Sequence, residues 1–460
     1  MTAEPISHAI KDYVADARWF GGKGREFEVT GVRRLAEVPG SPAGARVFIN
    51  LVELTYGTGE AELYQVPLAY YADAQHRLDH AFVGWWEEPD LGWVHAYDAL
   101  PDRESMAAWL GAFVDAPPPG PGGGLRFHRV PGHDLDPDAQ AALFSGEQSN
   151  SSVLFGEDSI LKVFRKITPG VNPDIEIHER LTQAASEHIA ALYGWVEHDE
   201  GAETLQLGML QQFLRTATDG WDLALASVRN LFAEEDLHAH EVGGDFAAES
   251  TRLGEALREI HETLATALPV DASPGPDEIA AAMTERLDAS LTVVPELAEH
   301  AARLRQLFAA VASLDDVECQ RIHGDLHLGQ TMRTTKGWKV VDFEGEPAKP
   351  LTERRLPDSR WRDVAGMMRS FDYAAHAVER SLLDHAEGAE QRAFRAQEWA
   401  HRNQNHFIVA YGGDLTEQQW TLLHAYAADK AVYECVYETR NRPAWVAIPL
   451  AAVARIGAPS

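Results

Sequence analysis

The apolar positions along the chain change their period, from about two in the first part to between three and four in the last. Residues 45–56 and 61–68 alternate apolar and polar side chains between Gly-containing turns, which predicts strands of a small sheet. From about residue 210 onward, the apolar residues recur at the spacing of amphipathic helices. This spacing is clearest in residues 252–264, 300–313, 360–376, 390–410 and 416–440. The pattern predicts a β-rich beginning and a mostly helical end.

The middle of the chain is predicted to be a mixed region. Residues 105–113 have a helical pattern, and the Pro- and Gly-rich run 117–124 then interrupts regular structure. A later helix is predicted to start at Asn172, which can cap its N-terminus, with Pro173 in the first turn. Short apolar runs predict strands at 127–130, 147–155, 159–164 and 205–214. The last of these runs is predicted to lead into a hinge.

Chain length sets the expected number of lobes. A chain of 460 residues exceeds one ordinary hydrophobic core, which predicts two to three domains or lobes. We predict an α+β fold with a β-rich cap in residues 1–95. An intermediate segment and a small lobe are predicted in 96–210, and a helical lobe in 211–460.

Composition excludes several classes of protein. The 71 acidic against 40 basic residues, a net charge of −31, argue against binding to nucleic acid or to an anionic membrane surface. No apolar run approaches a membrane span of about 20 residues, and the first residues lack signal-peptide features, so we expect a cytoplasmic protein. Two cysteines, Cys319 and Cys435, make no disulfide framework and are expected to be buried thiols.

The candidate chemistry is concentrated in residues 321–344. Asp325 lies on a polar turn after an apolar-flanked run and can accept the proton of an acceptor hydroxyl. Gln330 and Asp342 offer oxygen ligands that suit Mg²⁺, and Asp342 ends a short β-prone run. A loop carboxylate, an amide and a strand-end acid in this order predict an ATP-dependent kinase. His323 and His327 do not predict a zinc site, because nearby glycines make a helix unlikely there.

A second set of residues fits the nucleotide side of a kinase. Lys162 lies on a predicted strand, and Glu176 on the following helix can hold it against the nucleotide phosphates, with Glu179 as the alternative partner. The loop with Gln148, Ser149 and Ser151 stands where phosphates are covered, although it lacks the glycines of a Walker motif. Backbone groups from Gln211 to Phe213 are expected to contact adenine at the hinge.

Several sequence blocks resemble those of actinobacterial maltokinases. The resemblance covers about residue 145 to the C-terminus, and more weakly residues 18–25. The blocks lie at residues 148–151, 160–165, 172–176, 236–246, 323–330, 342–347, 362–371 and 430–434. The resemblance implies a bilobal protein-kinase-like fold of the aminoglycoside phosphotransferase and choline kinase type, with an N-terminal cap and a helical C-lobe that holds the acceptor.

The resemblance also implies roles for individual residues. ATP and Mg²⁺ are the implied cofactors, Asp325 the catalytic base, and Gln330 and Asp342 the metal ligands. The acceptor is predicted to contact Gln320, His323, Asp325, Arg369, Trp420, Glu434, Tyr437 and Trp445. The alternative for the aromatic members of this set is a place in the core of the last helix.

The acceptor is predicted to be a small sugar. Trp420 stands where maltokinases have a smaller residue, and a bulky indole there could shorten the pocket from two rings to one. Related kinases act on glucosamine, and an acidic pocket suits a protonated amino group. We therefore predict phosphorylation of glucosamine at C6, with maltose phosphorylated at C1 as the alternative. The same residues are also compatible with an aminoglycoside phosphotransferase or a nucleotide-binding pseudokinase sensor, and we expect a monomer.

Overall fold

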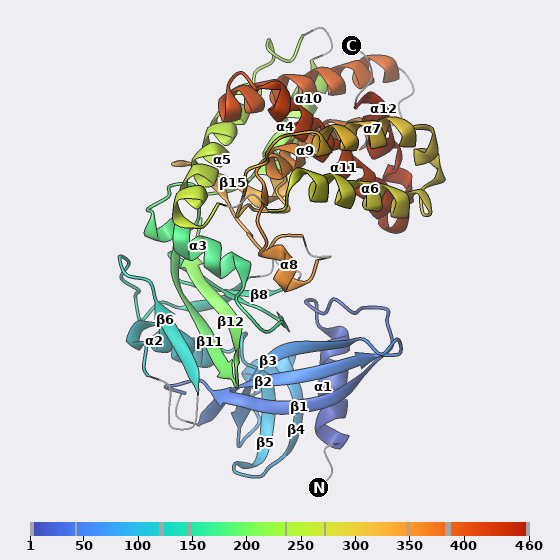
Figure 1. Ribbon diagram of the computed structural model, residues 1–460. Coiled ribbons are helices and arrows are strands. Elements are labelled where there is room, and N and C mark those ends of the chain that lie inside the picture. Colours follow the sequence, from blue (N-terminus) through green and yellow to red (C-terminus); the bar gives the residue numbers. More distant parts are fainter. Residues whose placement is uncertain are drawn as a thin grey trace. The chain divides into compact units, whose positions relative to one another are not determined.

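The computed structural model describes residues 4–41, 44–118, 124–144, 149–234, 237–270, 273–346, 349–381 and 388–456 (Figure 1). The chain divides into two compact units. The first unit comprises residues 1–179 and 190–215, and the second comprises 180–189 and 216–460. Among the described residues, no helix has the length and apolar content that crossing a bilayer requires.

An antiparallel sheet forms the N-terminal part of the first unit. Its strands follow the order β1 (Phe27–Glu37), β2 (Ala45–Tyr56), β3 (Ala61–Tyr71), β5 (Gly92–Asp98) and β4 (Phe82–Glu88). Helix α1 (Glu4–Asp16) packs on this sheet through Ile10 and Val14, both fully buried. The strands predicted in residues 45–56 and 61–68 are confirmed as β2 and β3, and both faces of each strand are buried over much of its length.

A second antiparallel sheet follows in the same unit. Its order is β6 (Leu125–Arg129), β11 (Leu192–Glu200), β12 (Glu203–Gln212), β9 (Ser159–Val163), β8 (Ser151–Phe155) and β7 (Ala141–Phe144). Helix α2 (Arg103–Asp115) packs against β6, where the rings of Trp109 and Phe113 meet Phe127 edge-on. Helix α3 (Pro173–Gln183) begins as predicted, and Oδ1 of Asn172 accepts from the Asp174 backbone N–H at 2.8 Å.

The two sheets are joined by hydrogen bonds within the first unit. Strand β10 (Lys166–Ile167) pairs with β3 of the first sheet, directly after the β9 strand of the second. Nε2 of Gln65 donates to the carbonyl of Phe164 at 2.7 Å. The buried Arg165 guanidinium reaches Asp98 at 3.0 Å and lies over the Trp19 ring. The boundary predicted near residue 95 stays a prediction.

Helices make up most of the second unit (Figure 1). They are α4 (Gly220–Ala233), α5 (Ala247–Ala267), α6 (Pro276–Leu291), α7 (Ala301–Ala312), α8 (Leu351–Arg354), α9 (Trp361–Ser381), α10 (Ala389–Gly412), α11 (Glu417–Asn441) and α12 (Ala447–Arg455). Helix α10 packs against both α5 and α9, and the aromatic side chains of Phe246, Phe371, Trp399 and Phe407 contact one another there. All five helical ranges expected from periodicity are confirmed by α5, α7, α9, α10 and α11.

Short strands frame the loop that carries the predicted chemistry. Strand β14 (Cys319–Gln320) pairs with β17 (Asp358–Ser359), and a small sheet contains β13 (Thr218–Asp219), β15 (Thr331–Thr334) and β16 (Gly337–Val340). The 3₁₀ turn η3 (Leu328–Gln330) connects the loop to β15. Cys319 and Cys435 are buried thiols, as predicted.

Candidate active site

The loop of residues 321–330 is fixed to helix α9 by one buried carboxylate. The two oxygens of Asp363 accept the backbone N–H groups of His323 and Gly324 at 2.8 and 2.9 Å. His261 on α5 lies 3.1 Å from the same carboxylate. Burial would raise the pKa of Asp363, but the hydrogen bonds and nearby imidazoles outweigh burial and lower it. The loop is therefore held by charge-assisted hydrogen bonds, although the sequence pattern gave Asp363 no role.

The side chains of Gln320 and His323 hold the loop rather than face an acceptor. Nε2 of Gln320 donates to the His261 carbonyl at 2.8 Å, and the residue is buried. Nε2 of His323 lies 3.0 Å from the Val341 carbonyl, and its Nδ1 accepts the Asp325 backbone N–H at 3.3 Å. Both side chains are thus engaged with backbone, whereas the sequence-based prediction placed them against the sugar. The structure gives them a positioning role.

Asp325 projects from this loop toward helix α11. Nζ of Lys430 donates to its Oδ1 at 2.9 Å. Burial would raise the pKa of Asp325, but the Lys430 ammonium outweighs burial and holds that pKa below its ordinary value. Burial alone would lower the pKa of Lys430, and the charges of Asp325 and Glu434 raise it instead. Asp325 is therefore an ionised carboxylate, which is the state a proton acceptor needs.

Gln330 and Asp342 lie side by side, as the prediction of a shared metal site requires. Nε2 of Gln330 is 3.3 Å from Oδ2 of Asp342, and the Val341 N–H donates to the Gln330 carbonyl at 3.0 Å. Both side chains are partly exposed. Asp342 has a φ of +65°, a left-handed conformation that non-glycine residues adopt at a cost and that is enriched at functional sites.

Helices α9 and α11 bring Arg369 and Glu434 together. Nε and Nη2 of Arg369 both donate to Oε2 of Glu434, at 2.9 and 2.7 Å. Nη1 of Arg369 donates to Asp372 at 2.5 Å. Burial raises the pKa of Glu434 more than the Arg369 charge lowers it. This pair lies one helical turn beyond Lys430, so α11 presents both groups on the same face.

The predicted aromatic contacts lie further along the same segment. Tyr437 is 44% exposed and stacks on Tyr433, so it is not a core residue. Trp445, in the 3₁₀ turn η4 (Pro443–Trp445), is half-buried with the Arg442 guanidinium over its ring. The alternative that these rings belong to the helix core is therefore wrong for Tyr437.

Trp420 lies apart from the catalytic loop. It precedes Lys430 by ten residues on α11, which places it about 15 Å away along the helix axis. Its indole lines a cavity of about 500 Å³ together with Arg369 and His424, and Asp325 does not line that cavity. Trp420 therefore does not narrow the space beside Asp325, which corrects the argument that it shortens the acceptor pocket.

On the nucleotide side, the first unit pairs Lys162 with a different acid from the one predicted. Nζ of Lys162 on β9 donates to Oδ2 of Asp174 at 3.0 Å, two residues before Glu176 on α3. Lys162 and Asp174 are 7% and 2% exposed. Burial would raise the pKa of Asp174, but Lys162 and His178 outweigh burial and hold it far below its ordinary value. The signal missed was an acid in the first turn of a helix capped by Asn172.

The other residues predicted to contact the nucleotide have different environments in the structure. Gln148 lies outside the described residues, and Ser149 is exposed. The Ser151 hydroxyl accepts from Arg165 at 2.8 Å. The Phe213 N–H donates to the Asp158 carbonyl at 2.8 Å and its carbonyl accepts from Arg215, so neither backbone group is left wholly to adenine. Gln211 instead carries a buried Oε1 without a hydrogen-bond partner.

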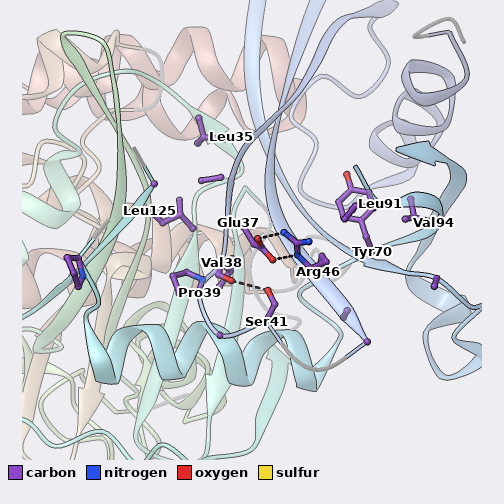
Figure 2. A pocket seen from close by; sticks show the side chains of 17 residues that line it. Leu35, Glu37, Val38, Pro39, Ser41, Arg46, Tyr70, Leu91, Val94 and Leu125 are labelled. Carbon is purple, nitrogen blue, oxygen red and sulfur yellow. Dashed lines mark hydrogen bonds and ion pairs between the residues drawn. The ribbon is translucent and has the colours of Figure 1, made fainter. Parts of the chain in front are cut away.

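Cavity size does not identify the candidate active site in this protein. A cavity of about 810 Å³ lies in the first unit beside β1, β2 and β6 (Figure 2). Its charged residues Glu37 and Arg46 form an ion pair with each other, and the Ser41 hydroxyl donates to the Val38 carbonyl. Among its described lining residues, burial raises the pKa of Tyr70 and the Glu37 carboxylate raises the pKa of Arg46, so both groups keep their protons near neutral pH. Its polar groups are largely satisfied and offer little for chemistry.

Two smaller cavities adjoin the catalytic loop in the second unit. The narrower, about 20 Å³, is lined by Asp325, Lys430 and Tyr433 among others, and has room for about one water molecule. The wider, about 380 Å³, lies between α6, the chain after Gly345 and α11. Both are lined by Arg286, Gly324, Glu346, Arg362, Tyr426 and Asp429. The space beside Asp325 thus widens into a polar cavity.

Comparison with known families agrees with this geometry. Residues 13–102 match the maltokinase N-terminal cap domain, and residues 140–345 match the phosphotransferase enzyme family. The chain is an ATP-dependent sugar kinase with segments similar to both of these families. The α+β kinase-like fold and the resemblance predicted from the sequence are confirmed, and so is the class of enzyme.

Two relatives of this kinase are named glucosamine kinase. The protein from Streptacidiphilus jiangxiensis is 27% identical over 401 residues, which cover 78% of this chain and 88% of that protein. The protein from Mycolicibacterium smegmatis is 27% identical over 325 residues, 67% of this chain and 77% of that protein.

Solved structures of a glucosamine kinase share the fold. The complex with glucosamine, ADP and inorganic phosphate aligns with a TM-score of 0.67 over 96% of this chain and 98% of that chain, at 21% identity. A second crystal form aligns with a TM-score of 0.69 over 96% and 97%, also at 21% identity. The alignments span the cap and both lobes.

Proposed function

We propose that this kinase transfers the γ-phosphoryl group of ATP to the 6-hydroxyl of glucosamine. The observation that carries the proposal is the ionised Asp325, held by Lys430 beside a polar cavity. Two relatives at 27% identity are named glucosamine kinase, and one solved structure of this fold holds glucosamine and ADP. These names support the choice of acceptor.

In the proposed mechanism, Asp325 orients the acceptor hydroxyl and accepts its proton as the oxygen attacks the γ-phosphorus. Lys430 keeps Asp325 ionised and fixes the direction of its carboxylate. The backbone of the loop is fixed in position, because two consecutive N–H groups donate hydrogen bonds to Asp363. Lys162, held by Asp174, is proposed to contact the nucleotide phosphates.

Gln330 and Asp342 fit a Mg²⁺ site by the chemistry of their donors. A carboxylate and an amide oxygen are hard ligands, and both side chains are partly exposed, so bound waters can complete the shell. Mg²⁺ would neutralise the phosphate charges. To bind the metal, the Gln330 amide must turn its oxygen toward it. The two side chains are already in contact, at 3.3 Å between Nε2 of Gln330 and Oδ2 of Asp342.

The narrow cavity favours an exocyclic hydroxyl as the acceptor. Its volume of about 20 Å³ admits a group the size of a water molecule and excludes a sugar ring. A ring can occupy the wider cavity of about 380 Å³ while its hydroxymethyl arm reaches Asp325. This arrangement supports attack by the C6 oxygen.

Maltose is the second candidate acceptor, because the cap matches the maltokinase cap domain. Since Trp420 does not narrow the space beside Asp325, the described residues do not limit the acceptor to one ring by that route. The distinction therefore depends on measured turnover.

The activity test is ADP release from magnesium-ATP with glucosamine, maltose, glucose and kanamycin compared side by side. We expect the highest kcat/KM with glucosamine. A higher value with maltose would replace the proposed acceptor, and a higher value with kanamycin would make the protein an aminoglycoside phosphotransferase. No turnover with any of the four would contradict the proposal.

Lys430→Met is expected to shift the pH dependence of turnover. The substitution removes the ammonium that lowers the pKa of Asp325 and leaves the burial that raises it. Because the base acts in its ionised form, the acidic limb of the kcat profile should move to higher pH. The profile of Lys336→Met, an exposed lysine, is the control. An unchanged acidic limb in Lys430→Met would show that Lys430 does not set this pKa.

A further inference from the structure

Asp429 is a buried acid that the mechanism above does not use. It precedes Lys430 on α11 and is 8% exposed. Its Oδ1 is fully buried and has no hydrogen-bond partner. Nε of Arg286 lies 3.3 Å from Oδ1, but the geometry is not that of a hydrogen bond. A buried carboxylate oxygen left in this state costs free energy, so its retention in a protein calls for an explanation.

The unpartnered oxygen belongs to a residue that lines both cavities beside the catalytic loop. Asp429 borders the narrow cavity with Asp325, and it also borders the wider cavity of about 380 Å³. Asp429 and Lys430 are consecutive on α11, so the helix that fixes the catalytic base also places this carboxylate. A ligand that occupies both cavities therefore borders Asp325 and Asp429 together.

Two neighbouring acids, Glu346 and Asp358, accept hydrogen bonds, whereas among the described residues Asp429 has only the ion pair with Arg286. Arg362 donates to Glu346 at 2.6 Å and to Asp358 at 2.7 Å, and the Tyr426 hydroxyl donates to Asp358 at 2.6 Å. Carboxylate oxygens of Glu346 and Asp358 are therefore already occupied by hydrogen bonds from the protein. Of these three described acids, Asp429 is the one with a buried oxygen, Oδ1, that accepts no hydrogen bond.

The charge of the wider cavity indicates what kind of donor fits. Its described lining contains five acidic and four basic residues, which leaves one negative charge without a counterpart when all are ionised. The acids are Glu278, Glu346, Glu353, Asp358 and Asp429, and the bases are Arg286, Lys349, Arg354 and Arg362. A ligand with one positive charge balances this set, whereas a neutral sugar does not.

We propose that Asp429 determines specificity for an amino sugar, by accepting a charge-assisted hydrogen bond from the acceptor's ammonium group through Oδ1. The inference rests on the proposed function and names the residue that distinguishes glucosamine from neutral sugars. An ammonium supplies three donors and the missing positive charge, and a hydrogen bond between charged groups is about twice as strong as a neutral one. Glucose offers a hydroxyl at the same carbon and leaves the carboxylate charge unbalanced.

The test compares glucosamine with glucose in Asp429→Asn, which keeps the shape of the side chain and removes its charge. The ratio of kcat/KM for glucosamine to kcat/KM for glucose is expected to fall about tenfold to a hundredfold, the range for a hydrogen bond to a charged group. The KM for ATP should stay within about twofold of the wild-type value, since Asp429 is proposed to contact the acceptor alone. Asp429→Ser, which introduces a smaller neutral residue, should lower the ratio in the same way and replaces Asp429→Asn if that variant folds poorly.

The matched control is Asp245→Asn, which makes the same chemical change at an acid paired with Arg402 and away from both cavities. Its ratio should equal that of the wild type. An unchanged ratio in both Asp429 variants, with melting temperatures close to wild type, would overturn the assignment of Asp429. Absence of turnover with either sugar in the wild type would instead contradict the proposed function, and calorimetric titration of both sugars would then test Asp429 by binding.

Discussion

Replacing Asp325 with asparagine is expected to lower kcat by about two to four orders of magnitude, the usual contribution of a positioned general base. The amide keeps the shape of the carboxylate but cannot accept the proton of the acceptor hydroxyl. Nucleotide binding should be retained, because Asp325 is proposed to act on the acceptor. Steady-state turnover and a direct titration with an ATP analogue measure the two effects separately.

Asp222→Asn, at an exposed acid in the first turn of α4, provides the control for Asp325→Asn. It should leave kcat unchanged. If Asp325→Asn also kept wild-type turnover, or if the wild type bound nucleotide without turnover, the protein would be a nucleotide-binding sensor rather than a kinase. The difference between the two variants is therefore the expected signature of a catalytic base.

Lys162→Met is expected to lower kcat/KM for ATP by about tenfold to a hundredfold, since hydrogen bonds to charged groups contribute on that scale. Asp174→Asn should act in the same direction by releasing the ammonium from its position on β9. Both single variants should also lose stability, up to about 3–5 kcal/mol, because each breaks the buried ion pair between Lys162 and Asp174. Kinetics with varied ATP and denaturant unfolding measure the two quantities.

The double variant Lys162→Met/Asp174→Asn separates activity from stability. Removing both charges together should restore most of the stability, because neither charge of the Lys162–Asp174 pair then remains in the buried site. It should not restore kcat/KM for ATP. Lys166→Met serves as the control, since Lys166 is 54% exposed in its side chain and pairs with Glu62 at the surface. Recovery of activity in the double variant would show that the pair is only structural.

Local signals in the sequence predicted the elements and the catalytic loop. Apolar periodicity places α5, α7, α9, α10 and α11, because each helix buries one face. Asp325, Gln330 and Asp342 could be predicted together because they belong to one loop and the strand pair that follows it. Because these three residues are close together in the chain, their proximity in the fold could be predicted from the local sequence.

Contacts between distant segments could not be predicted in the same way. The choice of Asp174 over Glu176 depends on how the first turn of α3 meets β9, and both acids are compatible with a helix cap. Trp420 was placed near the acceptor by its position in the chain, but ten residues of α11 separate it from Lys430. Oδ1 of Asp429 has an ion-pair contact with Arg286 from α6 but accepts no hydrogen bond, and this geometry cannot be predicted from the local sequence.

The residues that position the catalytic loop also depend on contacts that the local sequence does not reveal. Gln320 and His323 looked like acceptor contacts because they flank Asp325 in the chain, yet both bond to backbone. Asp363 and His261 hold the loop from two helices that the sequence places 40 and 62 residues away from His323. Polar side chains near a catalytic residue can hydrogen-bond to backbone groups and fix the loop instead of binding substrate.

The most direct test of the central claim is the phosphorus NMR spectrum of the product formed from magnesium-ATP and glucosamine. A phosphomonoester coupled to the two C6 protons is the expected result, with one ADP formed for each product molecule. A phosphate on another carbon, or ADP formed only with maltose and carried on C1, would contradict the claim that this kinase makes glucosamine 6-phosphate.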